Sequence, residues 1–97
     1  MGVIELARVI EHFPAVRLTD IEKLTSSVHS SGSRRELIGH RGEAYIMESE
    51  HRHPGSRYLY FTNHSTVRYS TGYGSYTVER DRLIMKTHHS IYRFEIL

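Results

Sequence analysis

The sequence predicts an α+β domain in which two N-terminal helices pack on a curved antiparallel β-meander of about five to six strands, shaped like half of a barrel. Two observations lead to this prediction. Apolar residues recur with a helical period in residues 1–30 and with a period of two from residue 36 onward. Turn-forming residues also return at short intervals in the second part, which is typical of hairpins. At 97 residues the chain has room for a single domain, 1–97.

Residues 1–30 carry the helical pattern. In GVIELARVIEHF the apolar side chains follow the i, i+3, i+4, i+7 spacing of one helical stripe, and a proline ends the segment. A second helix is expected in LTDIEKLTSSV, where Thr19 and Glu22 have the spacing of a capping box. Serine-rich residues 31–35 are expected to form a linker, and residues 36–97 the antiparallel sheet.

Short turns set the expected register of the sheet. Three residue pairs each fit a two-residue loop between alternating strands, namely Gly72-Tyr73, Arg80-Asp81 and His88-His89. The expected cross-strand pairs, apolar against apolar on one face, are Tyr69–Tyr76, Val67–Val78, Val78–Leu83, Tyr76–Met85, Met85–Tyr92 and Leu83–Phe94. A slip of one residue would turn every one of these side chains to the other face, so the pattern favours this register.

Eight histidines and no cysteine raise the question of a metal site. In EHRHPG, His51 and His53 can supply two zinc ligands from one face of an extended segment, whereas a zinc site needs three or four. His88 and His89 are expected at the same end of the sheet, but about four strands away, roughly 19 Å in a flat sheet. We therefore expect a solvated hairpin tip, with no metal and no cofactor.

Histidine also suggests acid–base chemistry. The segments HSTV and HHSI each read His-x-Ser/Thr-aliphatic, the paired pattern of two-histidine phosphoesterases, but they fall at turns on opposite ends of the expected sheet. A ribonuclease-like arrangement with His53 or His89 as the base and an arginine on the phosphate stays open. His12, His29 and His40 belong to no recognisable constellation.

The sheet face opposite the expected core combines tyrosine, arginine and aliphatic side chains. The candidate binding residues on it are Tyr58, Tyr60, Arg68, Ile84, Ile91 and Arg93. A three-residue loop at 63–65 would pair Tyr60 with Arg68. Tyrosine beside arginine serves both single-stranded nucleic acid and protein interfaces. The aliphatic neighbours favour a protein partner or a second copy of the chain, with nucleic acid as the other possibility.

The function expected from these residues is that of a small non-enzymatic binding protein, of the inhibitor or adaptor type, which engages a macromolecular partner through the outer sheet face. The alternative is a small RNA-processing or phosphoester-cleaving enzyme that uses a histidine at the rim of the sheet. The two differ in shape, because an enzyme needs a concave pocket around a histidine and a binding protein needs a broad patch.

The carboxyl-terminal part has a family resemblance. YLYFT followed by GYGSYTVERDRLIM and YRFEIL, within residues 58–97, resembles the closing strands of lipocalin-like (calycin) β-barrel domains. The segment IGHRG stands without tryptophan where such domains often carry a Gly-x-Trp opening. The resemblance implies a ligand-holding or partner-binding role without catalysis, and it transfers no site residues.

The composition gives only limited information on the class of partner that the protein binds and on its cellular compartment. The formal net charge is +2, and arginine outnumbers lysine, which occurs only at Lys23 and Lys86. Arginine suits an anionic partner, but a charge of this size is by itself no footprint of nucleic-acid binding. No apolar stretch approaches the length that spans a bilayer, and no leader pattern opens the chain. We expect a cytoplasmic protein without a membrane partner.

Overall fold

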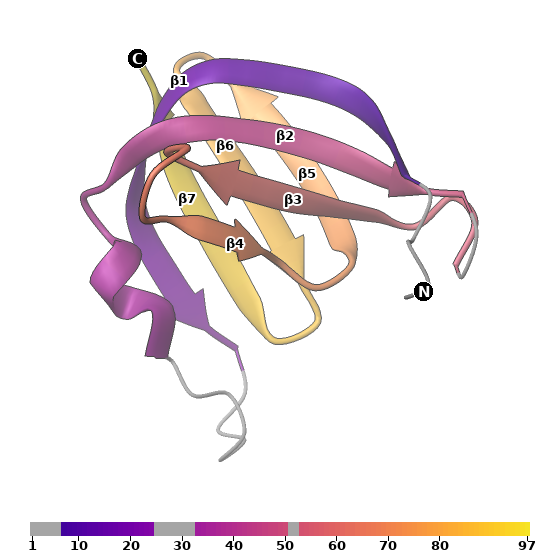
Figure 1. The fold of residues 1–97 in the computed structure, drawn as a ribbon. Helices are drawn as coiled ribbons and strands as arrows, with labels where there is room; N and C mark the ends of the chain where they lie inside the picture. Colours follow the sequence, from indigo (N-terminus) through magenta and orange to yellow (C-terminus); the bar gives the residue numbers. More distant parts are fainter. Residues whose placement is uncertain (1–6, 25–32, 51–52) are drawn as a thin grey trace.

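The chain is built almost entirely of antiparallel β-strands (Figure 1). The computed structural model describes residues 7–24, 33–50 and 53–97. The elements in these ranges are β1 (Ala7–Lys23), a 3₁₀ helix η1 (Ser33–Leu37), β2 (Arg41–Ser49), β3 (Arg57–Thr62), β4 (Arg68–Ser70), β5 (Gly74–Glu79), β6 (Arg82–Thr87) and β7 (Ser90–Ile96).

Six of the strands close into a barrel. Pairing runs in the order β2-β1-β7-β6-β5-β3-β4, and β2 also pairs with β3, which completes the ring. Strand β4 is an addition to this ring, because it pairs with one half of β3 while β5 meets the other end of β3 at Arg57 and Gly74. In Figure 1, β1 and β2 arch across β5, β6 and β7. Closure gives each ring strand a neighbour on both edges.

The prediction of an α+β fold with two N-terminal helices is wrong. Residues 7–23, which overlap both expected helices, form the single strand β1. This strand is long enough to pair with β2 along its first part and with β7 along its second part. The sheet is correspondingly a closed barrel and not a half-barrel covered by helices.

Three β-bulges explain why the sequence of β1 has the apolar periodicity of a helix. One extra residue enters β1 between Val9 and Glu11, between Phe13 and Val16, and between Leu18 and Asp20. A bulge lengthens the step between residues of one face from two positions to three. The core-facing residues of β1 are accordingly Ile10, Phe13, Val16, Leu18 and Ile21. Steps of three resemble the i, i+3 spacing of a helix, so the periodicity misled the prediction.

The expected helix signals have other roles in β1. Pro14 falls in the second bulge, one of the few places where a strand tolerates proline. Thr19, expected to cap a helix, donates its hydroxyl to the carbonyl oxygen of Arg93 at 3.0 Å. Glu22 accepts a hydrogen bond from Nη2 of Arg93 at 2.8 Å. These contacts tie β1 to β7.

The expected linker, residues 31–35, overlaps η1, whose Leu37 is buried in the core.

The core fills the interior of the barrel with side chains from β1, β2, β3, β6 and β7, from η1 and from the loop before β4. Its buried members are Phe13, Val16, Leu18, Ile21, Leu37, Ala44, Ile46, Leu59, Phe61, Val67, Leu83, Met85, Tyr92 and Phe94. The rings of Phe61 and Phe94 lie 5.4 Å apart, so β3 and β7 meet through the centre. No helix in the described ranges is long and apolar enough to cross a membrane.

The expected registers of the last two hairpins are confirmed. Their observed pairs are Val78–Leu83, Tyr76–Met85, Met85–Tyr92 and Leu83–Phe94. The pairs expected across Gly72-Tyr73 are wrong, because β4 turns back onto β3 and sets Tyr69 opposite Phe61. Val78 is also 44% exposed and not in the core. Strand β5 pairs with β6 along its length but with β3 only at Gly74, which leaves Val78 uncovered.

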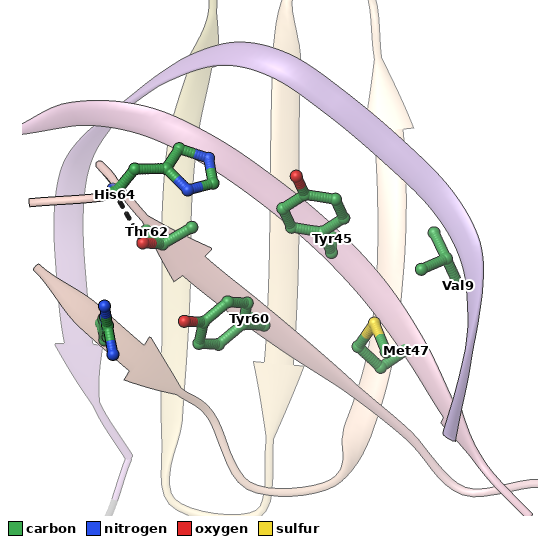
Figure 2. A pocket seen from close by; sticks show the side chains of 7 residues that line it. Val9, Tyr45, Met47, Tyr60, Thr62 and His64 are labelled. Carbon is green, nitrogen blue, oxygen red and sulfur yellow. Dashed lines mark hydrogen bonds between the residues drawn. The ribbon is translucent and has the colours of Figure 1, made fainter. Parts of the chain in front are cut away.

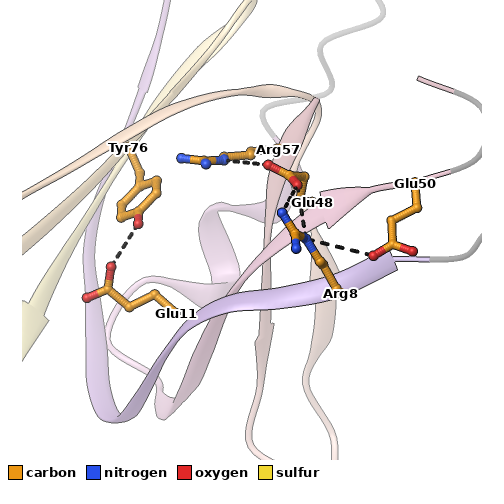
Figure 3. Close-up of polar contacts among 6 residues, drawn as sticks. All are labelled: Arg8, Glu11, Glu48, Glu50, Arg57 and Tyr76. Atoms are coloured by element: carbon orange, nitrogen blue, oxygen red, sulfur yellow. Dashed lines mark hydrogen bonds and ion pairs between the residues drawn. The ribbon is translucent and has the colours of Figure 1, made fainter. Parts of the chain in front are cut away.

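A hydrogen bond between two strands that are not paired with each other links β5 to β1. The hydroxyl of Tyr76 donates to Oε1 of Glu11 at 2.8 Å (Figure 3). This hydrogen bond and the partial burial of the ring raise the pKa of Tyr76 above its ordinary value. The two strands are not neighbours in the sheet order, so the contact holds the rim of the barrel together.

Candidate functional site

Three aromatic rings form a row across the outer face of β1, β2 and β3. The strand registers set His12 opposite Tyr45 and Tyr45 opposite Tyr60. The rings of His12 and Tyr45 are stacked, with centroids 4.4 Å apart and planes 9° from parallel. Tyr45 and Tyr60 follow at 6.3 Å with a tilt of 35°. We call His12, Tyr45 and Tyr60 the aromatic row.

The two tyrosines of this row border an open pocket of about 360 Å³ (Figure 2). Its lining residues are Val9, Tyr45, Met47, Tyr60, Thr62, His64 and Arg68. One end is apolar, since Val9 lies opposite Met47 and is 52% exposed. The other end is polar and carries His64 and Arg68. A pocket with an apolar end, ring faces and a cation suits a ligand that has both a flat ring and an anionic group.

Arg68 supplies the positive charge of the pocket. It is exposed on β4 opposite Thr62, and within the described ranges its guanidinium makes no hydrogen bond or ion pair. Other arginines of the barrel are engaged in ion pairs, among them Arg8, Arg17, Arg57 and Arg93. Since Arg68 needs no rearrangement to bind an anion, it is the natural contact for a phosphate or carboxylate.

Arg8 and Arg57 are two of the arginines that are engaged in ion pairs. Glu48 accepts hydrogen bonds from Nη2 of Arg8 at 2.7 Å and from Nε of Arg57 at 3.2 Å, which joins β1, β2 and β3 (Figure 3). Glu50 lies 3.8 Å from Nε of Arg8. The hydrogen bonds from Arg8 and then Arg57 lower the pKa of Glu48 below its ordinary value. This network stabilises the sheet and leaves little charge free for a ligand.

A carboxylate beside the aromatic row holds two histidines. Nε2 of His12 lies 2.8 Å from Oε1 of Glu43, and Nε2 of His64 contacts Oε2 of the same carboxylate. The hydroxyl of Tyr45 donates to Oε1 at 3.3 Å. The hydrogen bond with His12 is the main reason that the pKa of Glu43 lies below its ordinary value. We call His12, Glu43 and His64 the His–Glu–His cluster.

The protonation pattern of this cluster follows from its geometry. An ionised carboxylate can only accept hydrogen bonds, so both imidazoles donate to Glu43 through Nε2–H. The Nδ1 atom of each ring is then left for another partner. Three segments that are distant in sequence, β1, β2 and the loop after β3, supply the three side chains.

The loop after β3 is shaped to present His64. Oδ1 of Asn63 accepts hydrogen bonds from the backbone N–H groups of Ser65 and Val67, each at 2.9 Å. The backbone N–H of His64 donates to Oγ1 of Thr62 at 2.9 Å (Figure 2). His64 has φ of 62°, a left-handed conformation that histidine, asparagine and aspartate adopt more readily than most residues. The loop therefore carries the His64 ring in a defined position.

A second hollow of about 520 Å³ also borders His64. Its lining residues are Pro14, Ala15, Val16, Arg41, Gly42, Glu43, Thr62, Asn63, His64 and Leu97. Thr62 and His64 line both hollows. Arg41 is exposed at the start of β2, and no ion pair engages it in the part of the chain that the structure describes. The His–Glu–His cluster thus lies between two unengaged arginines, Arg68 and Arg41.

The six candidate binding residues do not share one surface. Tyr60 of β3 and Arg68 of β4 line the same pocket, and Tyr58 lies two residues before Tyr60 on β3. Ile84 belongs to β6 and Ile91 to β7. The sheet order separates β6 and β7 from β3 by β5 on one side and by β1 and β2 on the other. A flat meander would have kept these residues together, whereas the closed barrel moves them apart.

Two further expectations for these residues are corrected by contacts. Arg93 is held by Asp20 at 3.0 Å and by Glu22 at 2.8 Å, so it is engaged within the barrel. Arg68 lies opposite Thr62, and Tyr60 lies opposite Ser70, because the loop runs over 63–67 and is longer than expected. The direct Tyr60–Arg68 pair is therefore wrong, although both side chains reach the same pocket.

The histidines expected at the rim have contacts of other kinds. The ring of His53 meets Tyr73 edge-on at 5.2 Å, and Tyr73 in turn lies 6.0 Å from Tyr58. The ring of His89 lies 4.7 Å from that of His88. His51 lies outside the described residues, so the expectation of a solvated hairpin tip, in place of a zinc site with His51 and His53, stays a prediction. Within the described ranges, no group of three or more His, Asp or Glu side chains is placed to hold a metal ion.

The His–Glu–His cluster and most of the aromatic row were missed by reasoning from the sequence. Glu43, Tyr45 and Met47 alternate along one strand, and this pattern could have indicated a shared outer face. His12 could not have been placed, because its segment was interpreted as a helix.

No protein-family model, curated protein or solved structure matches the chain. The resemblance of residues 58–97 to lipocalin-like domains stays a prediction.

Proposed function

We propose that the protein binds single-stranded nucleic acid on the outer face of β1 to β4. Bases lie on the rings of Tyr45 and Tyr60, and phosphates bind Arg68. This is the nucleic-acid form of the macromolecular binding role expected from the sequence.

One observation carries the proposal: a cross-strand row of rings borders a pocket that also contains Arg68, an arginine with no partner in the described ranges. Stacking on an aromatic side chain contributes about 1–3 kcal/mol per base and tolerates any base. A guanidinium adds a bidentate contact to phosphate. The two together are the usual means of holding a single strand.

A protein partner is less well supported. A stable protein interface needs an apolar centre, for which Ile84 and Ile91 were the candidates. The barrel order sets these two residues on strands away from Tyr60 and Arg68. Val9 and Met47 remain as a small apolar end of the pocket, which suits the face of a base or sugar better than a protein surface.

Fluorescence anisotropy with labelled ten-nucleotide single strands, with the matching duplex for comparison, tests the proposal. Tyr60→Leu keeps an apolar side chain but removes the ring, and Arg68→Ala removes the cation. Each should weaken binding of the single strand roughly tenfold, in line with about 1–3 kcal/mol per contact. Arg82→Ala is the matched control, because Arg82 is exposed on β6, away from the pocket.

Salt dependence provides a second measure. If Arg68 and Arg41 each neutralise one phosphate, log Kd should rise with log salt with a slope of about 1.4, since each phosphate contributes about 0.7 for a single strand. An absence of binding at low salt would contradict the proposal. An Arg82→Ala variant that loses as much affinity as Tyr60→Leu and Arg68→Ala would also contradict it. So would a dimer in sedimentation that Tyr60→Leu converts to a monomer, because the face would then be a self-association surface.

A further inference from the structure

We infer that the His–Glu–His cluster cleaves the bound strand, so that the protein is a ribonuclease acting on single-stranded RNA. The inference rests on the proposed binding of single-stranded nucleic acid and names RNA as the substrate. It assigns the chemistry to His12 and His64, and not to the rim histidines His53 and His89.

The cluster has the groups that phosphodiester cleavage needs. Internal cleavage of RNA requires one group to take a proton from the 2′-hydroxyl and another to give a proton to the leaving 5′-oxygen. Two imidazoles on one carboxylate provide this pair, because Glu43 orients both rings through Nε2 and leaves each Nδ1 to meet the substrate. The stack on Tyr45 further fixes the ring of His12.

The cluster also lies where the phosphate is expected. His64 lines both hollows, and each hollow contains one unengaged arginine, Arg68 or Arg41. A strand with a base on Tyr60 and a phosphate on Arg68 therefore passes beside His64. A guanidinium at this position stabilises the negative charge that grows on the phosphoryl oxygens as the new bond forms.

The reaction needs no further reactant. The neutral imidazole accepts the 2′-hydroxyl proton at Nδ1 while the 2′-oxygen attacks phosphorus. The new P–O2′ bond forms as the P–O5′ bond breaks, and the protonated imidazole gives its Nδ1 proton to O5′. The products are a 2′,3′-cyclic phosphate and a 5′-hydroxyl. Proton exchange with water restores the starting protonation states of the two rings.

Cleavage should depend on pH with a bell-shaped profile, because one imidazole must be neutral and the other protonated. The titratable and charged side chains that face the two rings or line the same hollows are Glu43, Tyr45, Arg41 and Arg68.

Two variants separate catalysis from binding and folding. His12→Phe keeps a ring on Tyr45 but has no nitrogen. His64→Asn suits the left-handed backbone at this position and cannot transfer a proton at neutral pH. His88→Asn is the matched control, because His88 is an exposed histidine at the β6–β7 turn. Thermal melts show whether each variant is folded.

The assay uses a fluorophore-labelled ten-nucleotide RNA and the same sequence with 2′-O-methyl groups, with products identified by mass spectrometry. The wild type should cleave the RNA to a 2′,3′-cyclic phosphate and leave the 2′-O-methyl strand intact. Each cluster variant should lower kcat at least about 100-fold, the usual contribution of general acid–base catalysis. Binding of the uncleavable strand should weaken far less than kcat falls, because Tyr45, Tyr60 and Arg68 are unchanged in both variants, and His88→Asn should match the wild type in both measurements.

The outcomes separate the two proposals. Binding of the RNA without cleavage overturns the ribonuclease and leaves the binding function intact. Absence of both binding and cleavage overturns both. Cleavage that survives both cluster variants, or that disappears with His53→Ala or His89→Ala, overturns the assignment to His12 and His64.

Discussion

Replacing Gly74 with alanine should open the barrel. A Cβ atom at this position would lie 1.9 Å from the carbonyl oxygen of Lys86 and 2.8 Å from Cα of Thr87. Both are backbone atoms of β6, so no change of rotamer can relieve the contact. Non-bonded heavy atoms rest about 3.5 Å apart, and β5 must therefore move by roughly 1.5 Å.

The loss of folding stability depends on the contacts that this movement of β5 disturbs. Overpacking of this kind destabilises a protein by about 1–3 kcal/mol, occasionally more. Gly74 also forms the β3–β5 pair with Arg57 through which the barrel closes, and the displacement breaks that pair. We expect the free energy of unfolding to fall by an amount near the upper end, about 3 kcal/mol. This corresponds to a decrease in Tm of roughly 12–24 °C for a domain of this size.

Gly72 is the matched control, since a Cβ atom there meets nothing within 4 Å. Gly72→Ala should be neutral or slightly stabilising, because alanine restricts the unfolded chain by about 0.4–1 kcal/mol. Circular-dichroism melts and urea titrations of the two variants test the difference. If Gly74→Ala melts within a few degrees of Gly72→Ala, β5 does not approach β6 as described and the closure argument is wrong.

Three further predictions concern packing, charge and the site loop. Leu83→Ala should cost about 2–5 kcal/mol in urea titrations, because the side chain is 0% exposed, whereas Val78→Ala should change stability little. The pKa of Glu48 is lower in the folded chain, so its contribution to stability is present above the unfolded pKa and is lost as pH falls through the folded pKa. Melts of Glu48→Gln from neutral pH to about pH 3 should therefore lose less stability than those of the wild type. Asn63→Ala should speed amide hydrogen exchange in the loop 63–67, because two backbone N–H groups lose their acceptor.

The sequence by itself determined the parts of the barrel that depend on local connectivity. The hairpins that join β5, β6 and β7 have two-residue turns, and alternation along each strand leaves one register that buries Leu83 and Met85 together. The outward positions of Tyr58, Tyr60 and Arg68 followed from the same alternation. These features need only residues within a few positions of one another.

The tertiary structure decided the remaining features of the fold and the site, because these features depend on strands that are distant in the chain. Two bulges of β1 lie where this strand is fitted to β2 and one where it is fitted to β7, and they give its apolar residues a spacing that alone favours a helix. Closure through β2–β3 and β3–β5 separates Ile84 and Ile91 from the tyrosines. The same closure brings His12 and His64 onto one carboxylate, Glu43, from segments that share no local pattern. A contact between separated strands is set by the packing of the whole barrel, and no short stretch of sequence encodes it.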